Sequence, residues 1–466
     1  MTNTIRNRIS IIGGPLFGLL LFGLCTHFGH SNAIAWTAGI TALCATWWVT
    51  EPIPIPVTSL IPFVLFPVAG VLNHEQLAKA YGHYLILLLL GGFILSTAMA
   101  SSGAHRRLAV GMVRMVGGAG GRRLVLGFMI ATAVCSMWIS NTATTLMLLP
   151  VAMAILEQDE AKGGGDTLKI PLLLGIAYAA SIGGMGTPVG TPPNVIFMGI
   201  YEEATKTEVA FVDWMKIGIP VVCILLPIAW WYLTRSLKDS RSLDLPELGE
   251  WSTAERRVLI VFGITALAWV TRTAPFGGWT DLLNLPGVKD DTVALAAVVV
   301  LFLIPNGKGG RMLDWETANR IPWGLLLLFG GGIAIASAFM QSGLSDALGG
   351  WLANDLQITT WPVVLMTITI CLSVTFLTEV TSNTATTNLL MPVLAAAGIA
   401  AGIDPAMLMI PATLSASCAF MLPVATAPNA IVFGTNMVST KTMAREGFAL
   451  NVVGAILITG LMLFLL

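Results

Sequence analysis

The sequence predicts an all-α membrane protein that crosses the bilayer many times and contains two repeats of inverted topology. Three observations support this: the composition, an internal repeat and the distribution of positive charge. Of the 466 residues, 55% are hydrophobic and 11% are charged, whereas a soluble domain has about 25% charged residues. Several apolar stretches approach the roughly 20 residues that a helix needs to cross a bilayer; they are 11–24, 33–49, 85–99, 292–304 and 452–466.

Three landmarks of the sequence occur twice and in the same order. The motif Ser-Asn-Thr-Ala-Thr-Thr begins at Ser140 and again at Ser382, 242 residues later. Upstream, the Gly-Gly pair at 91–92 returns 240 residues later, and downstream the segment that begins at Thr187 returns in altered form 235 residues later, from Leu422. Because the spacing is nearly constant, we predict that the chain contains a duplicated unit.

The Lys and Arg residues indicate how the two units are oriented. With a cytoplasmic N-terminus and two hairpins that enter the membrane without crossing it, 19 of the 24 Lys and Arg residues fall in cytoplasmic segments, as the positive-inside rule expects. Making either hairpin a full crossing would reverse every later loop. The first hairpin then enters from the cytoplasm and the second from outside, which makes an inverted repeat with an external C-terminus. The basic residues left outside are Lys79, Lys206, Lys216, Arg272 and Lys289.

We therefore expect eleven spans and two re-entrant hairpins. Inverted repeats are typical of secondary transporters, whose substrate site lies near the bilayer midplane where the repeats meet. This reasoning predicts a multi-pass transporter of the cell (inner) membrane. The spans are expected near 10–28, 33–50, 53–72, 85–104, 170–200, 216–234, 256–272, 292–304, 321–341, 405–435 and 448–466, and the hairpins at 122–156 and 363–400.

The repeated polar motifs are predicted to form the binding site. A Ser-Asn-Thr turn offers hydroxyl and amide groups, and the helix that starts there adds free N–H groups that attract anions. The segments 190–194 and 425–429 contain prolines that should break their helices, so that released carbonyl groups can bind a small cation. Such motifs can also merely bridge or kink membrane helices. Four matched interruptions around an inverted repeat favour the binding site instead.

The charged residues near these motifs indicate how an anion would be neutralised. None of the four motifs contains Lys or Arg, and a divalent anion without a countercharge would face a large desolvation penalty. Bound Na⁺ can supply that charge. Glu379 lies beside the second motif, but its counterpart is Met137, so we interpret Glu379 as a hairpin anchor. Trp138 and the glycine pairs at 91–92 and 331–332 are interpreted as packing residues.

These motifs resemble those of the divalent anion/sodium symporter family, whose members carry dicarboxylates, citrate and sometimes sulfate. The resemblance covers essentially the whole chain. It implies C4-dicarboxylate transport coupled to Na⁺, a homodimer, and an elevator motion of the hairpins and their neighbouring spans. The implied substrate-binding residues are Ser140, Asn141, Thr142, Thr191, Ser382, Asn383, Thr384 and Thr426. The implied Na⁺ ligands are Ser136, Ser140, Asn141 and Gly190 at one site and Thr378, Thr381, Asn383 and Ala425 at the other.

The same resemblance divides the chain into four parts. Residues 1–118, with spans 1–4, and 241–355, with spans 7–9, are expected to form a fixed scaffold. Residues 119–240, with the first hairpin and spans 5–6, and 356–466, with the second hairpin and spans 10–11, are expected to form the transport part. One departure from the family pattern is the second break, which has Ala427 where the family usually has a first proline.

Other functions remain open at this point. A sodium-independent dicarboxylate antiporter or a sulfate carrier could use the same scaffold. An intramembrane enzyme would need a nucleophile beside a general base or a metal set, and no histidine lies near Ser140 or Ser382 in the sequence. We therefore predict that the protein is not an enzyme. A net charge of −1 gives no indication of a nucleic-acid partner.

Overall fold

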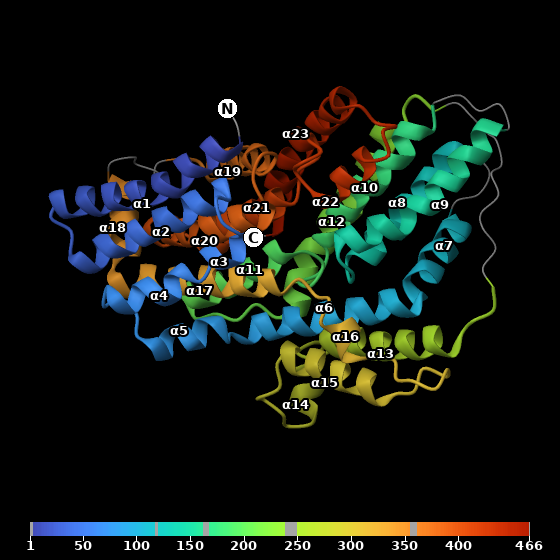
Figure 1. The fold of residues 1–466 in the computed structure, drawn as a ribbon, viewed down its shortest axis with the longest axis horizontal. Helices are drawn as coiled ribbons and strands as arrows, with labels where there is room; N and C mark the ends of the chain where they lie inside the picture. Colours follow the sequence, from blue (N-terminus) through green and yellow to red (C-terminus); the bar gives the residue numbers. More distant parts are fainter. Residues whose placement is uncertain (1–2, 117–119, 162–166, 238–248, 355–360, 466) are drawn as a thin grey trace.

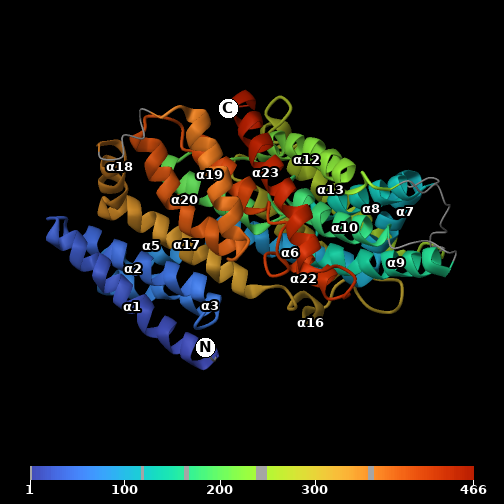
Figure 2. The same cartoon turned by 90° about the horizontal axis from the view of Figure 1, so that it is seen from above.

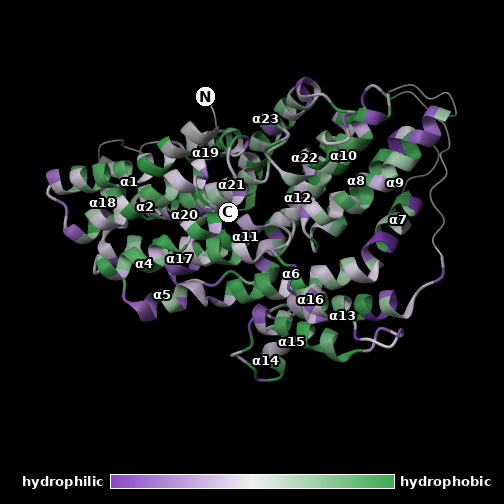
Figure 3. Cartoon of the chain, viewed as in Figure 1, coloured by the Kyte–Doolittle hydropathy of each residue, from purple (hydrophilic) through white to green (hydrophobic). Residues whose placement is uncertain are grey.

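A computed structural model describes residues 3–116, 120–161, 167–237, 249–354 and 361–465 of the chain. These residues form helices, turns and loops with a single isolated β-bridge, between Pro305 and Arg311. Within these described residues, six helical segments are long and apolar enough to cross a membrane: 9–27, 32–50, 74–102, 211–233, 323–342 and 440–465. Hydrophobic residues dominate the helices, whereas hydrophilic ones gather at helix ends and loops (Figure 3). This pattern fits a protein surrounded by lipid.

The chain begins with α1 (Asn3–His27), which packs against α2. Figures 1 and 2 show this pair at one end of the elongated molecule and α7 to α9 at the other. The remaining helices of the first half are α2 (Asn32–Thr50), α3 (Ile55–Thr58), α4 (Ile61–Val68), α5 (His74–Tyr81), α6 (Tyr84–Ser102), α7 (Ala104–Val116), α8 (Gly121–Ser136), α9 (Asn141–Ala161), α10 (Lys169–Gly184), α11 (Pro192–Thr205) and α12 (Phe211–Leu233).

The second half repeats much of this order. Its helices are α13 (Thr253–Val270), α14 (Gly278–Leu282), α15 (Asp290–Leu303), α16 (Trp315–Ala318), α17 (Trp323–Ser342), α18 (Leu344–Asn354), α19 (Val363–Thr378), α20 (Asn383–Ala400), α21 (Ala406–Ala416), α22 (Ala427–Phe433) and α23 (Thr440–Leu465). Helices α6 and α17 each end at a glycine in the left-handed conformation, Gly103 (φ 79°) and Gly343 (φ 80°). Each is followed directly by a shorter helix, so the chain turns the same corner twice.

Two helix pairs occur where the sequence predicts hairpins. The short segment 137–140 joins α8 to α9, and 379–382 joins α19 to α20. In each pair the second helix starts at the asparagine of the Ser-Asn-Thr motif, Asn141 or Asn383. The breaks expected within 170–200 and 405–435 are also present, because α10 and α11 are separated by 185–191 and α21 and α22 by 417–426.

The two halves interlock through these elements. Helix α11 contacts α20 and α21, and its counterpart α22 contacts α9 and α10. The segment after each break therefore packs on the hairpin of the other half. Outside this centre, α6 contacts α13 and α15, and α17 contacts α2 and α4. Because the helix after each break packs on the hairpin of the other half, the two hairpin tips lie at the same cavity.

Parts of the helical pattern differ from the prediction. The segment 53–72 forms the short helices α3 and α4 in place of one continuous span. Pro54 precedes α3, and Pro62 at the start of α4 has no amide hydrogen to donate back to α3. Helices α5, α7 and α18 were not predicted. The count of eleven spans stays a prediction. The expected part boundaries near 118, 240 and 355 lie next to or within segments outside the described residues.

Aromatic packing connects the first hairpin tip to its surroundings. The ring of Trp138 stacks at 6.1 Å from Phe211 of α12 and at 6.4 Å from Trp269 of α13, and Phe211 and Trp269 stack at 4.9 Å. Trp269 also donates a hydrogen bond of 2.8 Å from its indole nitrogen to the Asp290 carbonyl. These contacts agree with the interpretation of Trp138 as a packing residue.

Candidate functional site

A cavity of about 600 Å³ lies where the two hairpin tips meet the two broken helices. All eight predicted substrate-binding residues line it, although they come from four separate segments of the chain. Gly190 and Ala425, two of the predicted Na⁺ ligands, line it as well. The complete lining is Phe93, Ser140, Asn141, Thr142, Val189, Gly190, Thr191, Pro192, Arg320, Pro322, Leu325, Ser382, Asn383, Thr384, Val424, Ala425, Thr426, Ala427 and Pro428.

The two hairpin tips are held in the same way. The hydroxyl of Ser136 lies within hydrogen-bond distance of the side-chain oxygen of Asn141 (2.6 Å) and of the carbonyl oxygen of Ala180 (2.8 Å). In the second hairpin, the Thr378 hydroxyl bonds to the side-chain oxygen of Asn383 and approaches the Ala416 carbonyl at 3.2 Å. Each asparagine is therefore fixed by a hydroxyl at the end of the preceding helix.

Each broken helix is also held by an asparagine. The side-chain nitrogen of Asn194 donates to the carbonyls of Gly184 (3.0 Å) and Thr187 (2.7 Å) across the first break. Asn429 makes the equivalent bonds to Ala419 and Leu422 across the second, both at 3.0 Å. Both asparagines are fully buried. Each side-chain amide therefore closes the break in its helix; the carbonyls of Thr187 and Leu422 also accept the amides of Gly190 and Ala425.

The first break requires glycine at position 190. A Cβ atom added there would lie 2.5 Å from the carbonyl oxygen of Gly184. The chain therefore folds back on itself between these two residues, and any side chain would push the break open. This close approach holds Thr191 and Pro192 at the cavity wall.

Four helices begin at the cavity: α9, α11, α20 and α22. A helix N-terminus carries a partial positive charge and N–H groups that lack intrahelical partners. In α11 and α20 the N-cap side chains, Thr191 and Ser382, make no capping hydrogen bond. The hydroxyl oxygens of Ser140 and Thr426, in contrast, accept hydrogen bonds from the amides of Ala143 and Asn429. The convergence of these ends makes the cavity suited to an anion with two acidic groups.

The remaining predicted Na⁺ ligands, Ser136, Thr378 and Thr381, do not line the cavity. Ser136 and Thr378 are fully buried beside the asparagines of their tips. The hydroxyl of Thr381 donates to the Leu377 carbonyl at 2.8 Å and shares a 2.7 Å hydrogen bond with Thr386. The oxygens near Asn141 and Asn383 are hard ligands of the kind that a small cation prefers. Among the described residues no group of three or more His, Cys, Asp or Glu could hold a metal ion.

Glu379 anchors the second broken helix to the second hairpin. Its two carboxylate oxygens accept hydrogen bonds of 2.9 Å from the amides of Met421 and Leu422. Asn451 of α23 adds a third hydrogen bond, of 2.7 Å. Glu379 does not line the cavity. These contacts agree with the interpretation of Glu379 as an anchor. At the first tip, the Thr187 hydroxyl bonds to the carbonyl of Met137.

The sequence reasoning missed Arg320, the charged residue that lines this cavity. It lies between α16 and α17, far along the chain from the four motifs. Its guanidinium group is 3.1 Å from Glu316, and the side chain is 68% exposed. Phe93 and Pro322 were missed in the same way, because they come from segments without a polar motif. Comparing each charged residue with the residue 240 positions away in the other repeat would have drawn attention to Arg320, because its counterpart is Ala80.

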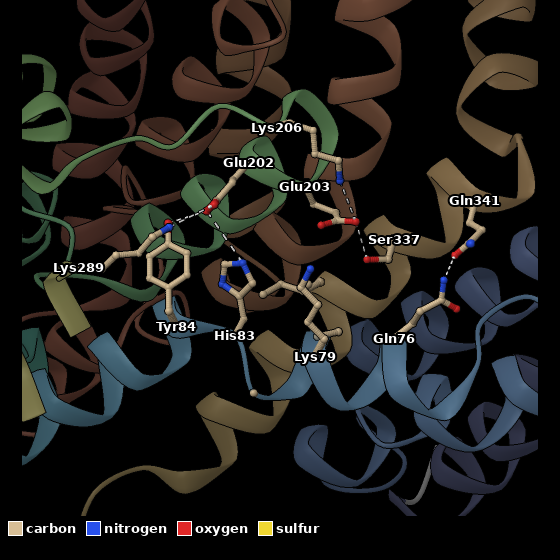
Figure 4. A pocket seen from close by; sticks show the side chains of 13 residues that line it. Gln76, Lys79, His83, Tyr84, Glu202, Glu203, Lys206, Lys289, Ser337 and Gln341 are labelled. Atoms are coloured by element: carbon tan, nitrogen blue, oxygen red, sulfur yellow. Dashed lines mark hydrogen bonds and ion pairs between the residues drawn. The ribbon is translucent and has the colours of Figure 1, made fainter. Parts of the chain in front are cut away.

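A second cavity, of about 570 Å³, lies at the other end of α11 (Figure 4). The Tyr84 hydroxyl donates a 2.6 Å hydrogen bond to Glu202, and the Lys289 ammonium lies 3.9 Å from the centre of the Tyr84 ring. Beside them, the Ser337 hydroxyl donates to Glu203 at 2.9 Å. These bonds connect the C-terminal end of α11 to α6 and α17.

The loop after α11 joins the same charged group. Lys289 lies 2.9 Å from Glu208, and Arg272 lies 2.9 Å from Glu208 and 2.6 Å from Asp290. Burial raises the pKa of Glu208, but the neighbouring Lys289 and Arg272 outweigh it and hold that pKa below its ordinary value. Burial lowers the pKa of Arg272, but the neighbouring Asp290 and Glu208 outweigh this effect, so the pKa lies above its ordinary value. Glu208 and Arg272 therefore both stay charged at neutral pH.

Comparison with known proteins places this arrangement in context. Residues 45–408 match the profile of a family described as citrate transporter. The sodium-dependent dicarboxylate transporter SdcS of Staphylococcus saprophyticus is 40% identical over 99% of this chain and 92% of its own length. SdcS of Staphylococcus aureus (strain USA300) is also 40% identical, over 96% of this chain and 89% of its own length.

Solved structures show the same fold at low sequence identity. The YdaH transporter of Alcanivorax borkumensis superposes with a TM-score of 0.60 at 17% identity, covering 85% of this chain and 90% of that one. MtrF of Neisseria gonorrhoeae gives a TM-score of 0.58 at 13% identity, covering 87% of this chain and 84% of that one. Similarity at this level concerns the fold alone.

Proposed function

Because the chain belongs to the citrate transporter family and is closely related to sodium-dependent dicarboxylate transporters, as its motifs indicated, we propose that it carries C4-dicarboxylates across the membrane together with Na⁺. Succinate and malate are the expected substrates, and citrate fits the same chemistry. The observation that carries this proposal is the single cavity lined by both Ser-Asn-Thr tips and both helix breaks.

The cavity supports binding of a dianion through polar groups and helix ends. Hydroxyl and amide groups of the tips can donate to two carboxylates, and the four helix N-termini favour negative charge. Sodium ions bound beside Asn141 and Asn383 would neutralise the remaining charge. We propose the site residues in these roles: Ser140, Asn141, Thr142, Thr191, Ser382, Asn383, Thr384 and Thr426 for the anion, and Ser136, Ser140, Asn141, Gly190, Thr378, Thr381, Asn383 and Ala425 for Na⁺.

The proposed transport cycle moves the site relative to a scaffold. The hairpins with α10 to α12 and α21 to α23 would form the moving part, in a homodimer whose N-termini are cytoplasmic and C-termini external. Support comes from the interlocking of these helices around one cavity and from the charge distribution. In this orientation the mouth beside Arg320 faces the cytoplasm, and the second cavity, at Lys79 and Lys289, faces outside.

Uptake by proteoliposomes tests the function. Purified protein should accumulate labelled succinate when an inward Na⁺ gradient is imposed, and replacing Na⁺ by choline should reduce uptake to that of empty liposomes. Equal uptake in both media, with stimulation by succinate loaded inside, would instead favour a sodium-independent antiporter. Competition by sulfate but not by malate would favour an inorganic anion as substrate.

A further inference from the structure

Arg320 brings a fixed positive charge to a cavity whose four polar motifs contain none. We propose that Arg320 binds a carboxylate of the substrate at the mouth of this cavity, and so raises the affinity for the dianion on that side of the membrane. This inference rests on the proposed function, since it assumes that the cavity takes a dicarboxylate. It adds a residue that lies outside the repeated motifs and outside the helices proposed to move.

The loop that carries Arg320 is held in place. Asp314 caps α16 by accepting a 2.8 Å hydrogen bond from the Thr317 amide, and the Arg320 amide donates to the Thr317 carbonyl at 3.2 Å. On the other side, the Trp323 indole nitrogen donates to the Asn319 carbonyl at 3.1 Å. The backbone at Arg320 is therefore held at the cavity wall, whereas its exposed guanidinium group can exchange one carboxylate partner for another.

The present partner of Arg320 is weakly held. Glu316 lies at 3.1 Å, but the two side chains are 68% and 86% exposed, and exposed ion pairs contribute little because water screens them. A substrate carboxylate entering the cavity can replace Glu316, since a guanidinium group binds carboxylates through two parallel hydrogen bonds. Glu316 then acts as a competitor of the substrate for Arg320.

The corresponding position in the other half lacks this charge. With the offset of 240 residues that relates the two glycine pairs, Arg320 corresponds to Ala80 and Phe93 corresponds to Ile333. Ala80 and Ile333 both line the second cavity, just as Arg320 and Phe93 line the first. Part of the wall of each cavity therefore comes from corresponding positions, and at this position the mouth next to the hairpin tips has an arginine where the second cavity has an alanine beside Lys79.

The proposal is tested by measuring succinate binding to two variants, one that removes the positive charge of Arg320 and one that removes the negative charge of Glu316. Arg320→Gln should weaken succinate binding to purified protein in Na⁺ by about three- to tenfold, the range expected for a partly screened charge pair. Glu316→Gln should strengthen binding, because it removes the competitor. Arg320→Lys should restore part of the affinity. Lys308→Gln is the matched control, because it removes an exposed cation that does not line the cavity and should leave the dissociation constant unchanged.

The signs of these effects distinguish binding from structural support. If Arg320→Gln leaves the dissociation constant unchanged, or if Arg320→Gln and Glu316→Gln shift it in the same direction, the proposal is wrong. Absence of sodium-dependent succinate binding by the unaltered protein would instead contradict the proposed function. Sidedness gives a second readout: Arg320→Gln should raise KM in inside-out vesicles and leave KM for uptake into intact cells unchanged. Equal increases on both sides would overturn the proposed asymmetry.

Discussion

The hydroxyl of Ser136 donates a 2.6 Å hydrogen bond to the side-chain oxygen of Asn141, five residues further along the chain. Thr378 and Asn383 form the same pair in the second hairpin. The hydroxyl differs between the halves, but its partner and its spacing do not. In both tips, the amide oxygen proposed to bind Na⁺ is therefore oriented by a buried hydroxyl, and the asparagine that carries it lines the proposed anion cavity.

We predict that Asn141→Ala and Asn383→Ala each weaken Na⁺ and succinate binding together. Each change removes an amide oxygen proposed for Na⁺ and a donor proposed for the carboxylate. Loss of a hydrogen bond to a charged group costs about 1.5–3 kcal/mol, so each affinity should fall about tenfold or more. Binding isotherms at several Na⁺ concentrations measure both constants.

Thr142→Ala and Thr384→Ala are the matched controls, because they change the same tips but are assigned to the anion alone. They should weaken succinate binding and leave Na⁺ binding without substrate unchanged. Linkage requires that Na⁺ and succinate raise each other's affinity by the same factor. Folded asparagine variants with unchanged succinate affinity and unchanged sodium dependence would show that the tips are structural turns.

Substitution of Glu379 should lower the stability of the fold and change the coupling of succinate transport to Na⁺ little. Glu379 accepts bonds from two amides and from Asn451, and losing a buried acceptor costs about 1–3 kcal/mol. Glu379→Met, which copies the residue of the first hairpin, should therefore lower Tm. Glu379→Gln should lower it less, because one acceptor oxygen remains.

Transport by the Glu379→Gln protein provides the contrasting measurement. Its sodium dependence should match that of the unaltered protein once uptake is normalised to the amount of folded protein. A changed number of Na⁺ ions per succinate, with Tm unchanged, would mean that Glu379 takes part in coupling.

The charged group around Glu208 predicts a dependence of stability on pH. The pKa of Glu208 is lower in the folded protein than its ordinary value of about 4.3, so its contribution is present above that pH and is lost as the pH falls through the folded pKa. Glu208→Gln should lower Tm at pH 7, and the difference should shrink as the pH falls below about 4. Asp213→Asn, which breaks an exposed pair with Lys216, should change Tm little at either pH.

Much of the site could be predicted from the sequence because its polar motifs are local and repeated. The offsets of 242 and 235 residues identified both tips and both breaks, and these segments line one cavity. The helices that run between the motifs were harder to predict. Arg320 reaches the cavity through tertiary packing of α17, and no local pattern indicates that. Likewise, 53–72 was predicted as one span, but the chain is divided into α3 and α4, with Pro62 at the start of α4.

Labelling from one side of the membrane tests the proposed orientation. A cysteine at Asn284, in the loop between α14 and α15, should react with an impermeant maleimide added to intact cells, because this loop is proposed to be external. A cysteine at Gly309, between α15 and α16, should react only after the membrane is opened. The native Cys223 is exposed, so it should be replaced by serine in both variants. The reverse labelling pattern would overturn the orientation.

The contact between Glu203 and Ser337 tests whether α11 moves relative to α17. The Ser337 hydroxyl lies 2.9 Å from the Glu203 carboxylate, and the two residues belong to the proposed moving part and scaffold. With cysteine at both positions, a short bifunctional thiol reagent should cross-link them and abolish sodium-driven succinate uptake in proportion to the yield, because the moving part would be fixed. Reducing a cleavable cross-link should restore uptake.

The matched control joins two residues of the proposed scaffold. Gln76 of α5 and Gln341 of α17 share a 2.7 Å hydrogen bond at the same cavity, so a cysteine pair there tests the effect of the reagent without connecting the two parts. Cross-linking 76 to 341 should leave uptake intact because neither residue is proposed to move. If a complete cross-link between 203 and 337 also left the uptake rate unchanged, α11 would not move against α17, and the division into scaffold and transport parts would have to be redrawn.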